Sequence, residues 1–328
     1  MSEVSEPVNA ADGGNIITDL KPGGQVDAVF FLREASPRQT RAGEPYLALK
    51  LSDRSGQVDA RVWESAAELA SQLKPDTYVR VSGKVESYRG RPQIRALTVE
   101  NVPADAVNQH DFLPSSYRDM DELTGYLDYF ITEIYNPDFS LLLKSFFSDQ
   151  EFMRRFRQAP GDVRSHHAYL GGLLEHTVSV ATLCQHVTVQ HPRLDADLLL
   201  TAALLHDIGK VVEYTYQGRI GYSKEGRLLG HVLIGRRMIE DRVRELECFP
   251  RDKALMLLHA LISHHGELEW GAPKKPQSAE ALVLHHIDNL DARVKGFLEI
   301  VAGRGEMSWP EMQNFFRRPL DEPMAADR

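Results

Sequence analysis

The chain has 328 residues, of which 42% are apolar and 26% are charged. This length favours two compact domains, and the apolar fraction is too high for a chain that is disordered throughout. The 38 basic and 47 acidic residues give a net charge of −9, which alone does not separate a metal-binding protein from a nucleic-acid-binding one. Cysteines occur only at Cys184 and Cys248, which excludes a disulfide scaffold and a cysteine-based zinc cluster.

Neither a membrane span nor a signal peptide is expected. The longest apolar run, at residues 198–205, is far shorter than the roughly 18–20 residues that a span needs. The N-terminal sequence MSEVSEPVNAADGG is acidic and polar, and we expect residues 1–16 to form a flexible tail. The sparse cysteines fit a reducing compartment, so we expect a cytoplasmic protein with no membrane partner.

Residues 17–104 carry a β pattern. Apolar and polar residues alternate at 46–51 and again at 58–62, and glycine- or proline-containing turns separate the segments. Five strands with a helix between the third and the fourth predict an OB-fold, a small barrel whose usual ligand is an oligonucleotide. The expected strands are 25–35, 46–52, 57–63, 77–88 and 93–101, and the expected helix is 64–73.

The outward faces of these strands carry aromatic and basic side chains. Between residues 15 and 104 there are 13 basic and 11 acidic residues, a net of +2, so the rest of the chain carries −9 − 2 = −11. Rings that stack on bases and cations that meet phosphates are typical of single-strand binding, although the outer face of any barrel is polar. The candidate contacts are Tyr46, Lys50, Arg61 and Arg80, and Trp63, Tyr78, Lys84 and Tyr88 share the pattern, with packing as the alternative for Trp63.

Beyond a linker that we place at 105–120, the pattern becomes helical. Leu123, Leu127, Phe130 and Ile134 follow the helical period. The predicted architecture is therefore an OB-fold followed by an all-α domain over 121–305, with a C-terminal tail at 306–328. Further helices are expected at 138–146, 149–157, 166–190, 195–208, 228–245, 252–265 and 278–302, with a candidate β-hairpin at 213–226.

Histidines are concentrated in the helical part: of thirteen, only His110 precedes residue 166. The segments LLEHT, LLHDIGK, LLGHV, LISHHGE and LHHIDNLDA set them among leucines. Imidazole and carboxylate are common ligands of Mn, Fe, Ni, Zn and Mg, and a divalent cation compensates for burying such groups. A lone histidine on an apolar helix is usually a hydrogen-bonded core residue, but this joint pattern predicts a metal centre. Its candidate ligands are His176, His206, Asp207, His231, His264, His265 and Asp288.

These segments, in this order behind a barrel, resemble the HD-domain metallophosphohydrolases, whose signature is H…HD…D. Within that group the chain resembles the YhaM-type 3′→5′ exoribonucleases, which join an N-terminal OB-fold to a C-terminal HD domain. The resemblance covers about residues 17–305. It is most specific at HHAYLGGLLEHT, ALLHDIGK, GHVLIG and the segment from residue 263 to residue 292.

The resemblance implies two divalent ions, with Mn²⁺ expected and Mg²⁺, Fe²⁺, Co²⁺ or Ni²⁺ as alternatives. HD proteins with a third ion use a glutamate one turn before the first histidine, and because Gly172 stands there we expect no third ion. The implied ligands of the first ion are His176, His206, Asp207 and Asp288, and those of the second are His231, His264 and His265 with Asp207 as the bridge.

Two cations a few ångströms apart lower the pKa of a bridging water, so the reaction requires no protein nucleophile. We assign catalytic roles to Asp207 and to Lys210, one turn beyond it, which would contact a phosphate oxygen unless it is a solvated helix-end lysine. His166 and His167 are candidate substrate contacts. Asp291 shares a helical face with Asp288, and it either tunes the site or pairs with a lysine.

The expected function is hydrolysis of single-stranded RNA from its 3′ end to nucleoside monophosphates, with single-stranded DNA as a second candidate substrate. The polarity comes from the resemblance alone. One alternative is a phosphodiesterase of small cyclic or oligomeric nucleotides, and another is a nucleic-acid-binding regulator with an inactive HD site. The native metal, the preference for RNA or DNA, the target transcripts and a homo-oligomeric state stay open at this point.

Overall fold

The computed structural model describes residues 8–9, 16–40, 42–108, 111–164 and 166–301. The predicted tail at 306–328, and most of the one at 1–16, lie outside these residues. The chain divides into two compact units, and the main boundary along the sequence falls between Ser115 and Ser116. Among the described residues, no helix is both long and apolar enough to span a membrane.

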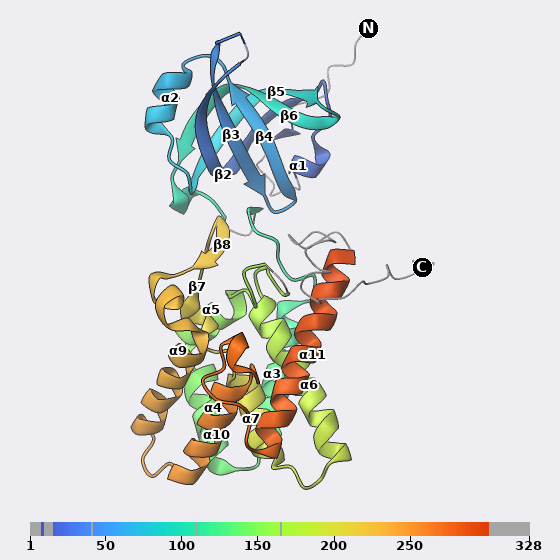
Figure 1. The fold of residues 1–328 in the computed structure, drawn as a ribbon, viewed down its shortest axis with the longest axis vertical. Helices are drawn as coiled ribbons and strands as arrows, with labels where there is room; N and C mark the ends of the chain where they lie inside the picture. The colour runs from blue at the N-terminus through green and yellow to red at the C-terminus, as the bar shows by residue number, and fades with distance from the viewer. Residues whose placement is uncertain (1–7, 10–15, 41, 109–110, 165, 302–328) are drawn as a thin grey trace, which may run out of the picture. The chain divides into compact units, whose positions relative to one another are not determined.

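The first unit is a closed barrel (Figure 1), which confirms the predicted OB-fold. The sheet order is β1-β2-β3-β4-β6-β5, and β2 also pairs with β5, which closes the sheet. The short parallel strand β1 was not predicted. The elements are β1 (Val8–Asn9), α1 (Ile16–Asp19), β2 (Gln25–Gln39), β3 (Pro45–Asp53), β4 (Gly56–Val62), α2 (Ala66–Gln72), β5 (Thr77–Tyr88), β6 (Arg91–Val102) and the 3-10 turn η1 (Ala104–Ala106).

Alternation along the strands builds the barrel core. Leu47, Leu49 and Leu51 of β3 are buried and face the interior, whereas Lys50 faces outward. A Cβ on Gly83 of β5 would stand 2.3 Å from a carbonyl oxygen of β6, so the close approach of these strands at a register shift requires glycine.

Tyr78 lies on the outer side of the barrel, as expected, but it is not available there as a surface side chain. Its side chain is 3% exposed and packs against Phe31 and Phe112, with ring centroids 5.4 Å and 4.8 Å away. Phe112 comes from the segment that follows the barrel, which covers this side of β5 and turns an outer position into a buried one.

The second unit is helical with one small hairpin. Asp119, Asn136, Asp149, Asp195 and Ser223 each accept hydrogen bonds from first-turn amides and so fix where five of the helices begin. The elements are α3 (Met120–Thr132), α4 (Pro137–Phe147), α5 (Gln150–Gln158), α6 (Gly172–Gln190), α7 (Ala196–Leu205), α8 (Lys210–Glu213), β7 (Tyr214–Gln217), β8 (Arg219–Tyr222), α9 (Lys224–Glu245), α10 (Arg251–Ser263), the 3-10 turn η3 (Leu268–Trp270) and α11 (Ala279–Val301).

The helix expected at 166–190 begins six residues later, at Gly172. Gly171 has a φ of +80°, and a Cβ on Gly172 would stand 2.1 Å from the carbonyl oxygen of His167. The two glycines therefore let a loop fold back against the start of α6. His166 and His167 lie in this loop and not on the helix.

Candidate metal centre and nucleic-acid face

The predicted ligands come from five separate stretches of the helical unit. His176 lies on α6, His231 on α9 and Asp288 on α11, while two pairs follow the ends of helices: His206 and Asp207 after α7, and His264 and His265 after α10. A helix end leaves a short turn in which the side chains of adjacent residues can point to one place. The structure brings all seven side chains into contact.

The first cluster contains His176, His206 and Asp288. The Nε2 atom of His176 lies 3.3 Å from Nε2 of His206 and 3.1 Å from Oδ1 of Asp288. The Oδ2 atom of Asp207 lies 3.3 Å from His206 Nε2 and 3.5 Å from His176 Nε2. Both histidines are 0% exposed.

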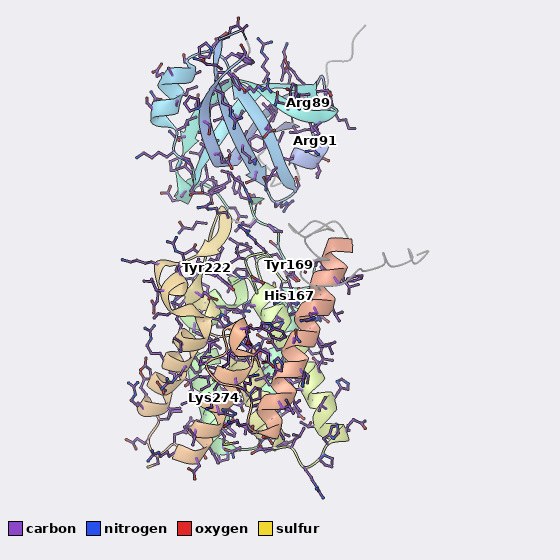
Figure 2. The ribbon with its side chains drawn as sticks, in the orientation of Figure 1. Arg89, Arg91, His167, Tyr169, Tyr222 and Lys274 are labelled. Atoms are coloured by element: carbon purple, nitrogen blue, oxygen red, sulfur yellow. The ribbon has the colours of Figure 1, made fainter. Side chains whose placement is uncertain are left out.

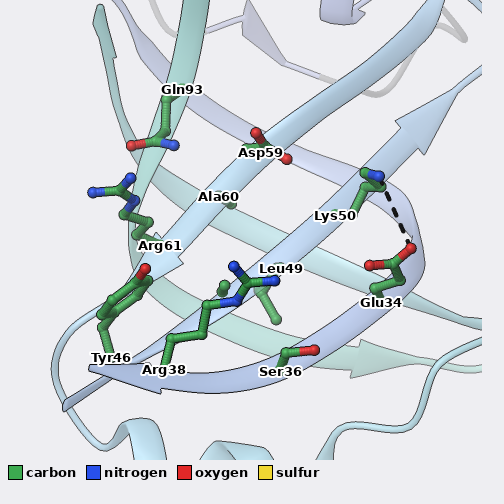
Figure 3. Close-up of a pocket in the computed structure, with 11 residues that line it drawn as sticks. Glu34, Ser36, Arg38, Tyr46, Leu49, Lys50, Asp59, Ala60, Arg61 and Gln93 are labelled. Atoms are coloured by element: carbon green, nitrogen blue, oxygen red, sulfur yellow. Dashed lines mark ion pairs between the residues drawn. The ribbon is translucent and has the colours of Figure 1, made fainter. Parts of the chain in front are cut away.

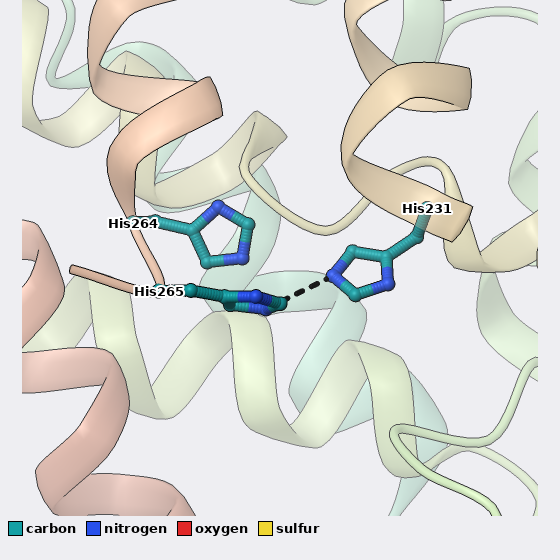
Figure 4. A group of neighbouring side chains, drawn as sticks. All are labelled: His231, His264 and His265. Atoms are coloured by element: carbon teal, nitrogen blue, oxygen red, sulfur yellow. Dashed lines mark hydrogen bonds between the residues drawn. The ribbon is translucent and has the colours of Figure 1, made fainter. Parts of the chain in front are cut away.

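The second cluster contains His231, His264 and His265 (Figure 4). The Nε2 atoms of His231 and His265 are 3.2 Å apart, and the ring centroids of His264 and His265 are 4.3 Å apart. The other oxygen of Asp207, Oδ1, lies 3.4 Å from His231 Nε2 and 3.7 Å from His264 Nε2. Asp207 therefore presents one carboxylate oxygen to each cluster.

A hydrogen bond at Nδ1 orients the ring of each of five histidines. Their Nδ1 atoms bond outward to carbonyl or carboxylate oxygens, which directs Nε2 with its lone pair into the site. The pairs are His176 with Asp291 (2.7 Å), His206 with the Ala203 carbonyl (2.8 Å), His231 with Glu213 (2.9 Å), His264 with the Leu261 carbonyl (2.6 Å) and His265 with the Trp270 carbonyl (2.9 Å).

This arrangement fits a divalent metal. When Nδ1 of both rings carries the proton, the Nε2 atoms that face each other at 3.2–3.3 Å have no proton to share. Oδ1 of Asp207 is buried and has no hydrogen-bond partner among the described residues. A cation among these atoms would give a partner to the facing Nε2 lone pairs and to Oδ1 of Asp207. Imidazole nitrogens and carboxylate oxygens are ligands that divalent transition metals accept.

The charges keep the carboxylates ionised. Burial alone raises the pKa of Asp207, but the neighbouring charges of Lys210 and His206 outweigh it and hold that pKa well below its usual range. Burial lowers the pKa of His265 to about 4 and also lowers that of His264, so both rings are neutral and can act as ligands. His176 differs from these two rings, because burial is outweighed by its hydrogen bonds to Asp288 and Asp291, which raise its pKa to about 10, so this ring would release a proton on taking an ion.

Lys210 is not a solvated helix-end lysine. It is 6% exposed, and its Nζ lies 2.6 Å from Asp207 Oδ2 and 2.7 Å from the carbonyl oxygen of Gly161. The charge of Asp207 outweighs burial and raises the pKa of Lys210. The lysine therefore compensates the charge of the central carboxylate and fixes its position.

Asp291 and His167 lie behind the first cluster. Asp291 accepts from His176, from Ser179 and, at 3.1 Å, from His167, so it orients the His176 ring and does not pair with a lysine. His167 is 1% exposed, and its Nδ1 lies 3.0 Å from the hydroxyl of Tyr169 (Figure 2 labels both). Both ring nitrogens of His167 are thus engaged within the protein, unlike those of a substrate contact.

His166, in the same loop, lies nearer the surface. Its side chain is 16% exposed, with Nδ1 3.5 Å from Asp162 Oδ2 and its ring centroid 5.7 Å from that of His176.

Sequence reasoning missed Glu213. Its two carboxylate oxygens accept from the ring and from the backbone amide of His231, at 2.9 Å and 3.1 Å. The available signal was a glutamate directly after the apolar pair Val211-Val212, seven residues beyond His206, where a buried acid needs a partner.

The barrel has a hollow of about 220 Å³ on its outer face (Figure 3). Tyr46, Lys50 and Arg61 all line it, and Arg61 stands over the rings of Tyr46 and Tyr88 at 5.3 Å and 4.5 Å. Trp63 packs beside Tyr46, with ring centroids 5.1 Å apart. Three of the four predicted nucleic-acid contacts therefore lie together.

Arg80 is not part of this hollow. It forms two hydrogen bonds with the carboxylate of Asp27 across β2 and β5, at 2.8 Å and 3.0 Å. The hollow contains instead Arg38 and Gln93, which were not predicted. Two further cations, Arg89 and Arg91, stand at the turn between β5 and β6 (Figure 2).

Each of the two units matches a known protein family. Residues 173–293 match the HD domain, and residues 23–102 match the OB-fold nucleic acid binding domain. Part of the chain is similar in structure to a replication protein A heterotrimer bound to ssDNA (27% identity, 27% of this chain and 64% of that chain, TM-score 0.21). The single-stranded DNA binding protein of Thermus aquaticus is similar to the same degree (26% identity, 24% of this chain and 40% of that chain, TM-score 0.22). With TM-scores this low, neither similarity bears on function.

The similarity to one curated protein spans both units. Over 273 residues the chain is 34% identical to the 3′-5′ exoribonuclease YhaM of Bacillus subtilis (strain 168). The aligned region covers 83% of this chain and 86% of that protein. An OB-fold and an HD domain follow each other in the order that the sequence predicted. The chain belongs to the YhaM family of 3′-5′ exoribonucleases.

Proposed function

We propose that this protein is a metal-dependent 3′→5′ exoribonuclease that shortens single-stranded RNA to nucleoside monophosphates, with single-stranded DNA as a second substrate. The observation that carries the proposal is the position of Asp207, which presents Oδ2 to one histidine cluster and Oδ1 to the other. Family membership supplies the substrate class and the polarity.

The site would hold two divalent ions, with Mn²⁺ as our first choice and Mg²⁺, Fe²⁺, Co²⁺ or Ni²⁺ as alternatives. Such ions, when bound, supply an activated water and neutralise the charge of the phosphodiester. Asp207 joins the two ligand sets, and Lys210 keeps its carboxylate ionised and in place. Lys210 thus acts on the reaction through Asp207. The proposed ligand sets are His176, His206 and Asp288, and His231, His264 and His265.

The barrel, residues 17–104, would capture the strand, and the helical unit, residues 121–305, would cleave it. Tyr46 and Arg61 offer stacking surfaces, and Lys50 offers a charge for phosphate. His166, at the edge of the metal site, is the proposed contact to the scissile nucleotide. Arg80 and His167 do not enter this proposal, because each is already bonded to a carboxylate of its own unit.

Two other functions are tested against this one. A small-nucleotide phosphodiesterase has no use for the aromatic and basic hollow of the barrel, and a regulator with an inactive HD site has no reason to keep seven convergent ligands. The test is a gel assay on 5′-labelled single-stranded RNA with Mn²⁺, with Mg²⁺ and with a chelator. We expect a metal-dependent ladder that shortens from the 3′ end. Internal cuts, release of the labelled 5′ nucleotide, or cleavage of a cyclic dinucleotide alone would overturn the proposal.

A further inference from the structure

The candidate ligands differ in their exposure to solvent. The side chains of His176 and His206 are 0% exposed and that of Asp207 is 3% exposed, whereas those of His231 and Asp288 are 12% and 15% exposed. The site is therefore open to a phosphodiester near His231 on α9 and Asp288 on α11, and residues beside these two positions are candidates to hold its nucleotide.

Trp270 borders this opening. Its backbone carbonyl accepts the Nδ1 hydrogen of His265 at 2.9 Å, so the residue is one hydrogen bond from a candidate ligand. The turn η3 that carries it is held by backbone bonds from Trp270 and Ala272 to the carbonyl of Glu267. Yet the indole is 48% exposed, an unusual state for the largest aromatic side chain.

A cation stands over the same ring. The guanidinium carbon of Arg293 lies 5.8 Å from the Trp270 ring centroid. Arg293 also donates from Nε to Asn289, at 2.7 Å, on the turn of α11 that carries Asp288. Next to the indole, with ring centroids 6.1 Å apart, lies His285, 8% exposed, whose Nδ1 donates to the carbonyl of His264. Trp270 is thus connected to His265 of the second cluster, and Arg293 is connected through Asn289 to the turn that carries Asp288 of the first cluster.

We propose that Trp270 and Arg293 form a nucleotide-binding subsite beside the metal centre, where the indole stacks on a base of the substrate and the guanidinium contacts its phosphate. This inference rests on the proposed function. A half-exposed ring with a cation at its face is the combination that single-strand binding uses, and stacking on a ring accepts any base. The subsite therefore selects a nucleic-acid strand without selecting its sequence.

The test uses the full-length protein and an oligoadenylate of four nucleotides, in kinetics with Mn²⁺. Trp270→Ala should raise KM for this tetranucleotide about 10- to 100-fold while kcat changes little, and Trp270→Phe should restore most of the loss. Leu268→Ala is the matched control, since Leu268 is 57% exposed on the same turn. The backbone acceptor of His265 survives each substitution, so Mn²⁺ stoichiometry should not change.

A second readout needs no loss of function. Binding of the same tetranucleotide with a phosphorothioate at its last linkage should quench the tryptophan fluorescence of the parent, and Trp270→Phe should lose that quench. An active parent with no quench, and with the same KM in Trp270→Ala as in Leu268→Ala, would overturn the subsite alone. A parent that cleaves no RNA would instead overturn the proposed function.

Discussion

The two units hold their candidate functional groups in opposite ways. In the helical unit the candidate ligands are mostly buried, and five histidines are each fixed by a hydrogen bond from Nδ1 to a carbonyl or carboxylate oxygen. In the barrel the candidate groups are partly exposed and packed mainly on one another, as Arg61 is on Tyr46. A buried site allows one arrangement of its groups, whereas a surface that stacks on bases allows many. We therefore expect substitutions in the helical unit to cost far more activity than substitutions in the barrel.

The largest effect should follow from Asp207→Ala. Among the described residues, Asp207 is the only carboxylate that contacts both histidine clusters, so its removal should lower the rate on RNA by at least roughly a thousandfold. The measurement is the initial rate with Mn²⁺, beside a circular dichroism spectrum that checks the fold. Asp128→Ala, at an exposed position of α3, is the control. Activity within tenfold of the parent, in a sample cleared of contaminating nuclease, would refute the assignment.

The next prediction divides the buried site itself. His264→Ala should reduce bound Mn²⁺ from two ions per chain to about one and remove most of the activity, because its Nε2 belongs to the second cluster. His176→Ala should perturb the other ion. Metal analysis of protein dialysed from saturating Mn²⁺ measures both. A parent that holds one ion, with a fully active His264→Ala, would show a mononuclear centre.

A smaller effect is expected in the barrel. Tyr46→Ala with Arg61→Ala should weaken binding of a long single strand about tenfold or more and reduce its salt dependence, while turnover of a tetranucleotide persists. Arg80→Ala should weaken binding less, because Arg80 is bonded to Asp27. Fluorescence anisotropy at several salt concentrations compares the variants. Equal losses for Arg80 and Arg61 would show that the hollow is not the binding face.

The candidate site of the helical unit could be predicted more fully from the sequence than that of the barrel, because its polar residues lie within apolar segments. Buried polar residues stand out because a charged or polar side chain among leucines needs a partner, and this signal singled out His206 and Asp207, which the structure buries side by side. Glu213 gave a weaker signal, since one glutamate has no period and its partner, His231, is 18 residues away. The helix start at Gly172 depended on two glycines whose effect comes from the loop that folds against them.

On the barrel, alternation predicts which side a residue faces but not which residue it meets across the sheet. Arg80 and Arg61 have the same pattern in sequence. They differ because the register places Asp27 beside Arg80, 53 residues away, and places Tyr46 beside Arg61. Tyr78 faced the expected side, but the segment that covers it comes from beyond the barrel. Cross-strand register and covering segments are tertiary properties that a strand pattern does not contain.

The smallest predicted effect concerns stability in the helical unit. Burial raises the pKa of Glu299, on α11, to about 7, and its Oε1 has no hydrogen-bond partner among the described residues. The folded state therefore holds this proton more tightly than the unfolded state, whose ordinary value is 4.5. Between these two values the folded state binds more protons, so its stability falls as the pH rises, and the loss is complete above about pH 7.

Glu299→Gln carries no charge at any pH and should remove this loss. We expect the variant to melt about 2 °C higher than the parent at pH 8 and at nearly the same temperature at pH 4.5. Glu247→Gln, at an exposed position after α9, is the control, because it has no burial to relieve. Thermal melts of the three proteins at both pH values measure the difference. If Glu299→Gln gained the same stability at both pH values, the charge of the Glu299 carboxylate would not be the cause of the gain.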